Sequence, residues 1–187
     1  LNTIDFIVCN HGEVDHSGSL PALMEKIPNT PIYCTENAVK SLVGQYHHPE
    51  WNFKTVKTGD SVDIGNGKSL VFVEMRMLHW PDSMVTLLNK DNILFCNDIF
   101  GMHYASTQRF DDEVNEADWI YEAKKYYANI ILPYSKMVSA FLGTVKKIGL
   151  SPKIICPDHG FLWRSNPAKA VEMYTEFSAQ KNKKKAL

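Results

Sequence analysis

The stretch HGEVDH, residues 11–16, decides more about this chain than any other. It follows the apolar run IDFIVC, residues 4–9, which predicts a short buried strand. The stretch contains four side chains of metal-binding types: His11, Glu13, Asp15 and His16. A helix would spread these side chains around its cylinder, whereas a loop that leaves a strand can direct all four into one cavity. A cluster this polar is buried only where a positive charge neutralises it. The stretch therefore predicts a loop that binds metal.

Three further candidate ligands occupy similar places along the chain. His79 follows the strand-like run VFVEMRML, Asp98 follows ILFCN, and His159 follows IICPD. Taken singly, each is explained equally well as a capping or turn residue. Together with residues 11–16 they give four histidines, one glutamate and two aspartates. Seven ligands suit two metal ions that share one bridging carboxylate.

Four motifs resemble one protein family. They are HGEVDHSGSLP at 11–21, HWPDSM at 79–84, FCNDIFG at 95–101 and PDHGFLWR at 157–164. The pattern H-x-[EH]-x-D-H, followed by a distant His, Asp and His, resembles the metallo-β-lactamase superfamily. Glu13 replaces the second histidine of the hydrolases, and this makes the chain similar to the flavodiiron proteins. The motifs span residues 11–164, which is nearly the whole chain.

The resemblance implies a fold and a ligand set. The fold is α/β, an αββα four-layer sandwich of the metallo-β-lactamase type, expected to be incomplete at its N-terminus. One iron would take His11, Glu13 and His79, the other would take Asp15, His16 and His159, and Asp98 would bridge them. Residues 1–180 would form the diiron domain, the central section of a longer chain. Residues 181–187 would be a linker toward a flavodoxin-like FMN domain that this chain lacks.

The resemblance also implies an activity and its partners. A flavodiiron protein reduces O₂ to water, NO to N₂O, or both, with electrons that FMN receives from rubredoxin or a similar donor. The active form would be a head-to-tail homodimer or a dimer of dimers. The ligands alone do not rank O₂ against NO.

Two other functions use similar ligands. A dinuclear zinc hydrolase would favour neutral imidazoles, which keep the metal a strong Lewis acid. Glu13, Asp15 and Asp98 instead supply three negative charges, which suit a redox pair of irons better. A non-catalytic diiron O₂ sensor would use the same ligands, and only turnover distinguishes it from an enzyme.

Several residues near the motifs are candidates for supporting roles. Asp82 is expected to accept a hydrogen bond from a ligating histidine, as such histidines usually require. Trp80 would pack over a ligand. His103 and Tyr104 follow Asp98 closely, and the sequence allows both a place at the mouth of the cavity and a simple surface turn. His47 and His48 lie far from the four motifs and are interpreted as part of a surface loop.

The composition of the chain limits its domain number and the classes of partner that it can bind. The chain has 187 residues, 44% of them hydrophobic, which is enough for one domain with a substantial core. A formal net charge of −1 predicts no binding to nucleic acid, and no apolar run reaches membrane-spanning length. The first residues lack the features of a signal peptide. Four cysteines outside any C-x-x-C pair predict buried thiols in a reducing cytoplasm.

Hydrophobic periodicity and turn residues predict the elements β-loop-α-β-α-β-β-β-β-α-α-β-α. The helices are expected at residues 17–27, 36–46, 116–127 and 134–148, with a last one beginning at Asn166-Pro167. The strands are expected at 4–9, 31–34, within 55–76, at 84–88 and 93–96 as a hairpin, and at 153–156.

Overall fold

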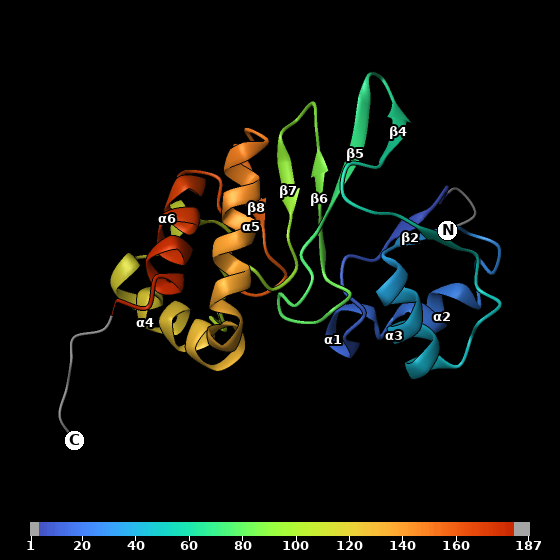
Figure 1. Ribbon diagram of the computed structural model, residues 1–187, viewed down its shortest axis with the longest axis horizontal. Helices are drawn as coiled ribbons and strands as arrows, with labels where there is room; N and C mark the ends of the chain where they lie inside the picture. Colours follow the sequence, from blue (N-terminus) through green and yellow to red (C-terminus); the bar gives the residue numbers. More distant parts are fainter. Residues whose placement is uncertain (1–3, 182–187) are drawn as a thin grey trace.

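Two β-sheets lie between two layers of helices in the computed structural model, which describes residues 4–181 (Figure 1). The first sheet has three parallel strands in the order β1-β2-β3. They are β1 Ile7–Val8, β2 Ile32–Cys34 and β3 Phe53–Thr55. The second sheet has five strands in the order β4-β5-β6-β7-β8, antiparallel except for the last pair. They are β4 Ser61–Gly65, β5 Lys68–Glu74, β6 Met84–Leu88, β7 Ile93–Phe95 and β8 Ile154–Cys156.

The helices form two groups on opposite sides of the sheets (Figure 1). Beside the first sheet lie α1 Val14–Ser17, α2 Leu20–Met24 and α3 Glu36–Tyr46. Beside the second sheet lie α4 Glu116–Tyr126, α5 Ser135–Lys147 and α6 Pro167–Ser178. Three short helical segments complete the set: η1 Asp111–Glu113, η2 Tyr127–Ile131 and η3 Leu132–Tyr134.

Alternation along the strands explains how the layers are held together. In β2, Ile32 and Cys34 are buried in a cluster with α2 and α3, while Tyr33 points the other way. The ring of Tyr33 stacks on Phe72 of β5 at 6.3 Å, so the two sheets pack face to face. The opposite face of the second sheet packs against α4, α5 and α6 through a large apolar cluster. The αββα architecture implied by the resemblance is therefore confirmed.

Most elements form where the sequence predicts them, but the first helix does not. Residues 36–46 form α3 as expected, and β6 and β7 form the expected hairpin. The single helix expected at 17–27 is wrong, because two short helices, α1 and α2, take its place. Pro21 accounts for the break, since its ring would clash with the carbonyl of the preceding turn and it lacks an N–H.

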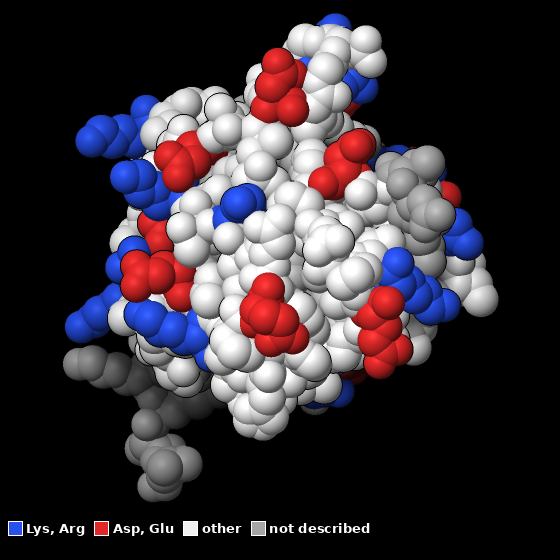
Figure 2. Space-filling view, turned by 90° about the vertical axis from the view of Figure 1, so that its right-hand side faces the viewer, with Lys and Arg blue, Asp and Glu red and all other residues white. Residues whose placement is uncertain are grey.

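The ends and the surface add little to the site. The predicted linker at 181–187 lies outside the described residues, except for Lys181. Within residues 4–181 the structure contains no helix with the length and apolarity needed to cross a membrane. Acidic and basic side chains are interspersed on the face in Figure 2 rather than gathered by sign. All four cysteines are free thiols, and burial raises the pKa of Cys34 to about 12.

Candidate metal centre

The stretch at 11–16 changes from loop to helix in its middle, and this change divides its ligands. His11 and Glu13 lie in the loop after β1, and Glu13 has the extended backbone of a helix N-cap. Asp15 and His16 lie in the single turn of α1. The expectation of one loop through residue 16 is therefore wrong. Because the helix turns the chain, the later two side chains are directed to a different centre from the earlier two.

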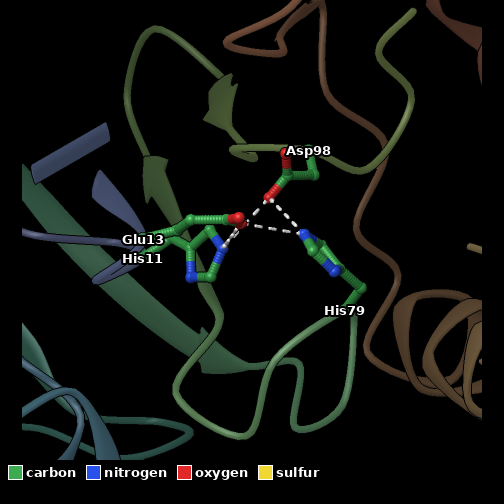
Figure 3. A group of neighbouring side chains, drawn as sticks. All are labelled: His11, Glu13, His79 and Asp98. Atoms are coloured by element: carbon green, nitrogen blue, oxygen red, sulfur yellow. Dashed lines mark hydrogen bonds and ion pairs between the residues drawn. The ribbon is translucent and has the colours of Figure 1, made fainter. Parts of the chain in front are cut away.

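The first ligand group consists of His11, Glu13, His79 and Asp98, whose side chains point toward one centre (Figure 3). One potential ligand atom from each lies within 4.8 Å of all the others. Oε2 of Glu13 is 3.2 Å from Nε2 of His11 and 3.1 Å from Nε2 of His79. His79 comes from the loop between β5 and β6, and Asp98 from the loop after β7.

The second ligand group consists of Asp15, His16 and His159, with the same mutual limit of 4.8 Å. Asp15 lies 3.5 Å from Nε2 of His16 and 3.3 Å from Nε2 of His159. His159 follows β8, which pairs in parallel with β7. That pairing brings the loop carrying His159 beside the loop carrying Asp98, as expected for the ends of neighbouring parallel strands.

Asp98 lies between the two groups with one carboxylate oxygen toward each. Its Oδ2 is 3.4 Å from Nε2 of His11 and 3.8 Å from Nε2 of His79. Its Oδ1 is 3.4 Å from Nε2 of His16 and 3.2 Å from Nε2 of His159. Only 3% of the side chain is exposed. A carboxylate in this place can touch two cations at once.

The arrangement fits two bound cations. Ligands roughly 2.1 Å from a first-row metal lie about 3.0 to 3.4 Å from one another, depending on the coordination geometry. Most of the separations above fall near that range. Among the described residues, Nε2 of His16 and Oδ2 of Asp98 are buried without a hydrogen-bond partner. Such atoms are rare in folded proteins unless a water or an ion satisfies them.

The charges of the cluster point the same way. Burial alone would raise the pKa of Asp98, but the imidazoles of His159 and His16 beside it outweigh burial and hold that pKa well below its usual range. Burial would lower the pKa of His16, but the hydrogen bond to Asp158 and the neighbouring carboxylate of Asp98 raise that pKa to about 10. Without a metal, the buried carboxylates thus demand positive charge from the imidazoles, and a cation would supply it instead.

Asp82 orients the first histidine. The carboxylate of Asp82 is completely buried. Its Oδ1 lies 3.2 Å from Nδ1 of His11, and its Oδ2 accepts a 2.7 Å hydrogen bond from the backbone N–H of Gly12. Nδ1 of His11 is thereby engaged, and Nε2 is left to face the centre. Trp80 packs edge-on against the same imidazole, with ring centroids 5.3 Å apart.

Sequence reasoning missed two residues at the centre. Asp158 accepts a hydrogen bond from Nδ1 of His16 at 2.9 Å, and the phenol of Tyr126 donates one to Oδ1 of Asp98 at 3.0 Å. Asp158 stands directly before His159, so a pattern of polar residues after a strand was available to find it. Tyr126 lies on the buried face of α4 and reads as core, so no sequence signal marks it.

His103 and Tyr104 have different surroundings. The exposed ring of His103 packs edge-on against His159 and Tyr126, with centroids 5.3 and 4.8 Å apart. Tyr104 packs instead against Phe161 at 6.3 Å, toward the hydrophobic core. Of these two residues, His103 borders the ligand groups and Tyr104 does not.

The comparisons with known proteins agree with this fold. The family model described as "ODP family beta lactamase" matches residues 1–160, and the chain belongs to this family. Among solved structures, it is similar to rubredoxin oxygen:oxidoreductase from Desulfovibrio gigas, with a TM-score of 0.92 and 36% identity, over 96% of this chain and 45% of that one. The flavodiiron protein from Giardia intestinalis gives a TM-score of 0.88 and 32% identity, over 95% and 43%. The resemblance to flavodiiron proteins is thereby confirmed.

Curated relatives are similar over the same region. The anaerobic nitric oxide reductase flavorubredoxin of Vibrio vulnificus is 59% identical over 93% of this chain. The protein of the same name from Aliivibrio salmonicida is 55% identical over 95%. This chain covers 35% and 36% of them, so it spans about a third of the length of these relatives.

Proposed function

We propose that this chain is the metal-binding domain of a flavodiiron enzyme that reduces NO to N₂O, O₂ to water, or both. One observation carries the proposal: the buried carboxylate of Asp98 presents one oxygen to each of two ligand groups. The proposed ligands of one iron are His11, Glu13 and His79. Those of the other are Asp15, His16 and His159. Asp98 bridges the two.

The ligand chemistry supports iron over zinc. Glu13 lies between His11 and His79. In the motif of the zinc hydrolases that this sequence resembles, the corresponding residue is a histidine. Together with Asp15 and Asp98 it supplies three carboxylates, hard ligands that suit a metal pair whose charge rises on oxidation. Two ferrous ions, when bound, supply two electrons and coordination positions for a diatomic gas.

The residues around the ligands hold the centre in place. Asp82 fixes the orientation of the His11 imidazole, and Asp158 does the same for His16. The Tyr126 hydroxyl holds one oxygen of Asp98 by donating a hydrogen bond to it. Such partners normally decide metal affinity together with the ligands themselves.

An electron store completes the proposal. Reducing one O₂ to water takes four electrons, twice what two ferrous ions hold. We therefore place FMN in a flavodoxin-like domain of a longer protein, with residues 1–180 as the metal domain and 181–187 as the linker. The relatives' greater length and the names flavorubredoxin and rubredoxin oxygen:oxidoreductase support this organisation and a rubredoxin-type donor.

The proposal extends to the assembly, the location and the substrate of the enzyme. A head-to-tail homodimer, or a dimer of dimers, would bring the flavin of one copy beside the irons of the other. Four free thiols support a reducing cytoplasm as the location. Higher identity to the nitric oxide reductases than to the oxygen oxidoreductase supports NO as the first substrate to test.

The test is metal content and turnover of the natural full-length protein, purified without oxygen from cells supplied with both iron and zinc. We expect about two irons per chain and multiple turnovers of NO, O₂ or both with reduced rubredoxin. Two zincs and no iron would refute the redox function and favour a hydrolase. Two irons without turnover of either gas would favour an O₂ sensor.

A further inference from the structure

We infer that the two metal positions are unequal and fill in order. Position 1, formed by His11, Glu13, His79 and Asp98, takes its metal first and holds it more tightly. Position 2, formed by Asp15, His16 and His159 with the other oxygen of Asp98, fills second. This inference rests on the proposed two-metal site and adds an order of loading to it.

The ligands of position 1 are the better shielded. The His11 side chain is completely buried, and the side chains of His79 and Glu13 are 16% and 33% exposed. In position 2, His16 is 7% exposed, but His159 is 24% exposed and Asp15 is 52% exposed, so the difference lies mainly in the carboxylate ligand. An exposed carboxylate must be desolvated and lose rotamer freedom before it ligates, and both cost binding free energy.

The carboxylates behind the two positions differ still more. Asp82, behind His11, is completely buried and is held from three directions. It engages Nδ1 of His11 and the N–H of Gly12 through its carboxylate, while its backbone carbonyl accepts a 2.8 Å hydrogen bond from Thr35 Oγ1. The His11 imidazole is therefore fixed before any metal arrives.

Asp158, behind His16, is held much less firmly. Its side chain is 49% exposed, and its carboxylate makes one described hydrogen bond, to Nδ1 of His16. Water competes for an exposed ion pair, which lowers its strength. Asp15, the carboxylate ligand of this position, is the second residue of the four-residue helix α1. Among its described ion pairs it contacts only the two histidines of its own group.

The shared carboxylate separates the two steps further. Once a cation binds beside Oδ2 of Asp98, a second cation must enter a few ångströms from it, against charge repulsion in a poorly solvated site. The second step is weaker whichever position fills first. Because Asp82 holds His11 more firmly than Asp158 holds His16, position 1 is the one that fills first.

The experiment starts from metal-free, full-length protein titrated with Fe²⁺ without oxygen, followed by calorimetry. We expect two steps, the first at least tenfold tighter than the second. Crystals prepared with one equivalent of iron should show anomalous scattering at position 1. Equal occupancy of both positions, or iron at position 2 alone, would overturn the inference.

Two matched isosteric variants test the cause. Asp82→Asn leaves one of two donors without an acceptor, and it should weaken the first step by about 10- to 100-fold. Asp158→Asn keeps an acceptor for His16 but removes the negative charge behind it, and Asp158 contacts no ligand of position 1, so the variant should weaken only the second step. A weakened first step in Asp158→Asn, or an unchanged first step in Asp82→Asn, would contradict the proposal.

If Asp82→Asn fails to fold, the crystals of the unaltered protein with one equivalent of iron decide. Iron bound equally at both positions refutes only the inequality, whereas no iron binding refutes the proposed function as well.

Discussion

Substituting Gly12 by alanine tests how tightly the centre depends on Asp82. A Cβ on residue 12 would lie 2.8 Å from Oδ2 of Asp82 and 3.2 Å from Cβ of Ser41. The first separation is shorter than a carbon and an oxygen tolerate, so one of the two must move. Asp82 is completely buried, and the space around it is already filled.

The magnitude follows from the bonds that such a movement breaks. If Asp82 swings away, it gives up the N–H of residue 12 and the imidazole of His11. A hydrogen bond to a charged group contributes about 1.5–3 kcal/mol, so the loss is about 3–6 kcal/mol before the structure relaxes. We expect Gly12→Ala to lower the free energy of unfolding by at least about 2 kcal/mol and to reduce iron binding at position 1 tenfold or more.

Gly44→Ala is the matched control. Gly44 is exposed within α3, and nothing lies within 4 Å of the Cβ it would gain. Alanine is the better helix former, so this variant should be neutral or more stable by up to about 1 kcal/mol, with unchanged iron content. Both variants are compared with the parent by denaturant unfolding and by iron analysis. Gly12→Ala with the stability and iron content of Gly44→Ala would refute the reasoning.

Three further variants probe the ligands. Asp98→Asn should lose most of the dinuclear site, because a neutral amide bridges two cations poorly; retention of two magnetically coupled irons, seen by Mössbauer spectroscopy, would place the bridge elsewhere. Glu13→His should keep two metals but favour zinc, since it removes a negative charge; unchanged iron occupancy and gas turnover by metal analysis and assay would mean that Glu13 is not a ligand. Tyr126→Phe removes the hydrogen bond to Asp98 with almost no change of volume, so the metal-free protein should lose about 1.5–3 kcal/mol of unfolding free energy. An unchanged unfolding curve for that variant would show that the hydrogen bond contributes nothing.

The local elements of the fold were largely predictable. The apolar positions of residues 36–46 recur at helical spacing, and α3 forms over those residues. Asn166 before Pro167 predicts a helix start, and its side chain accepts a hydrogen bond from the N–H of Lys169. These signals hold because a helix cap or a hydrophobic face involves residues a few positions apart. The single helix predicted at 17–27 is wrong because Pro21 interrupts it, and the loop predicted at 11–16 is wrong because α1 begins at Val14.

The sequence by itself determined which residue types gather after the strands, and hence that seven metal-binding side chains lie at strand ends. Residue types and spacing left open how these side chains divide; the family resemblance implied the division, and the tertiary structure produces it. The turn into α1 places His16 in the second ligand group, and the parallel pairing of β7 with β8 brings His159 to Asp98. It also decided which groups stand behind the ligands. His11 and Asp82 are 71 residues apart, and His16 and Asp158 are 142 residues apart. Periodicity reports which way a side chain faces within its own element, whereas a contact across such separations exists only after the layers have packed.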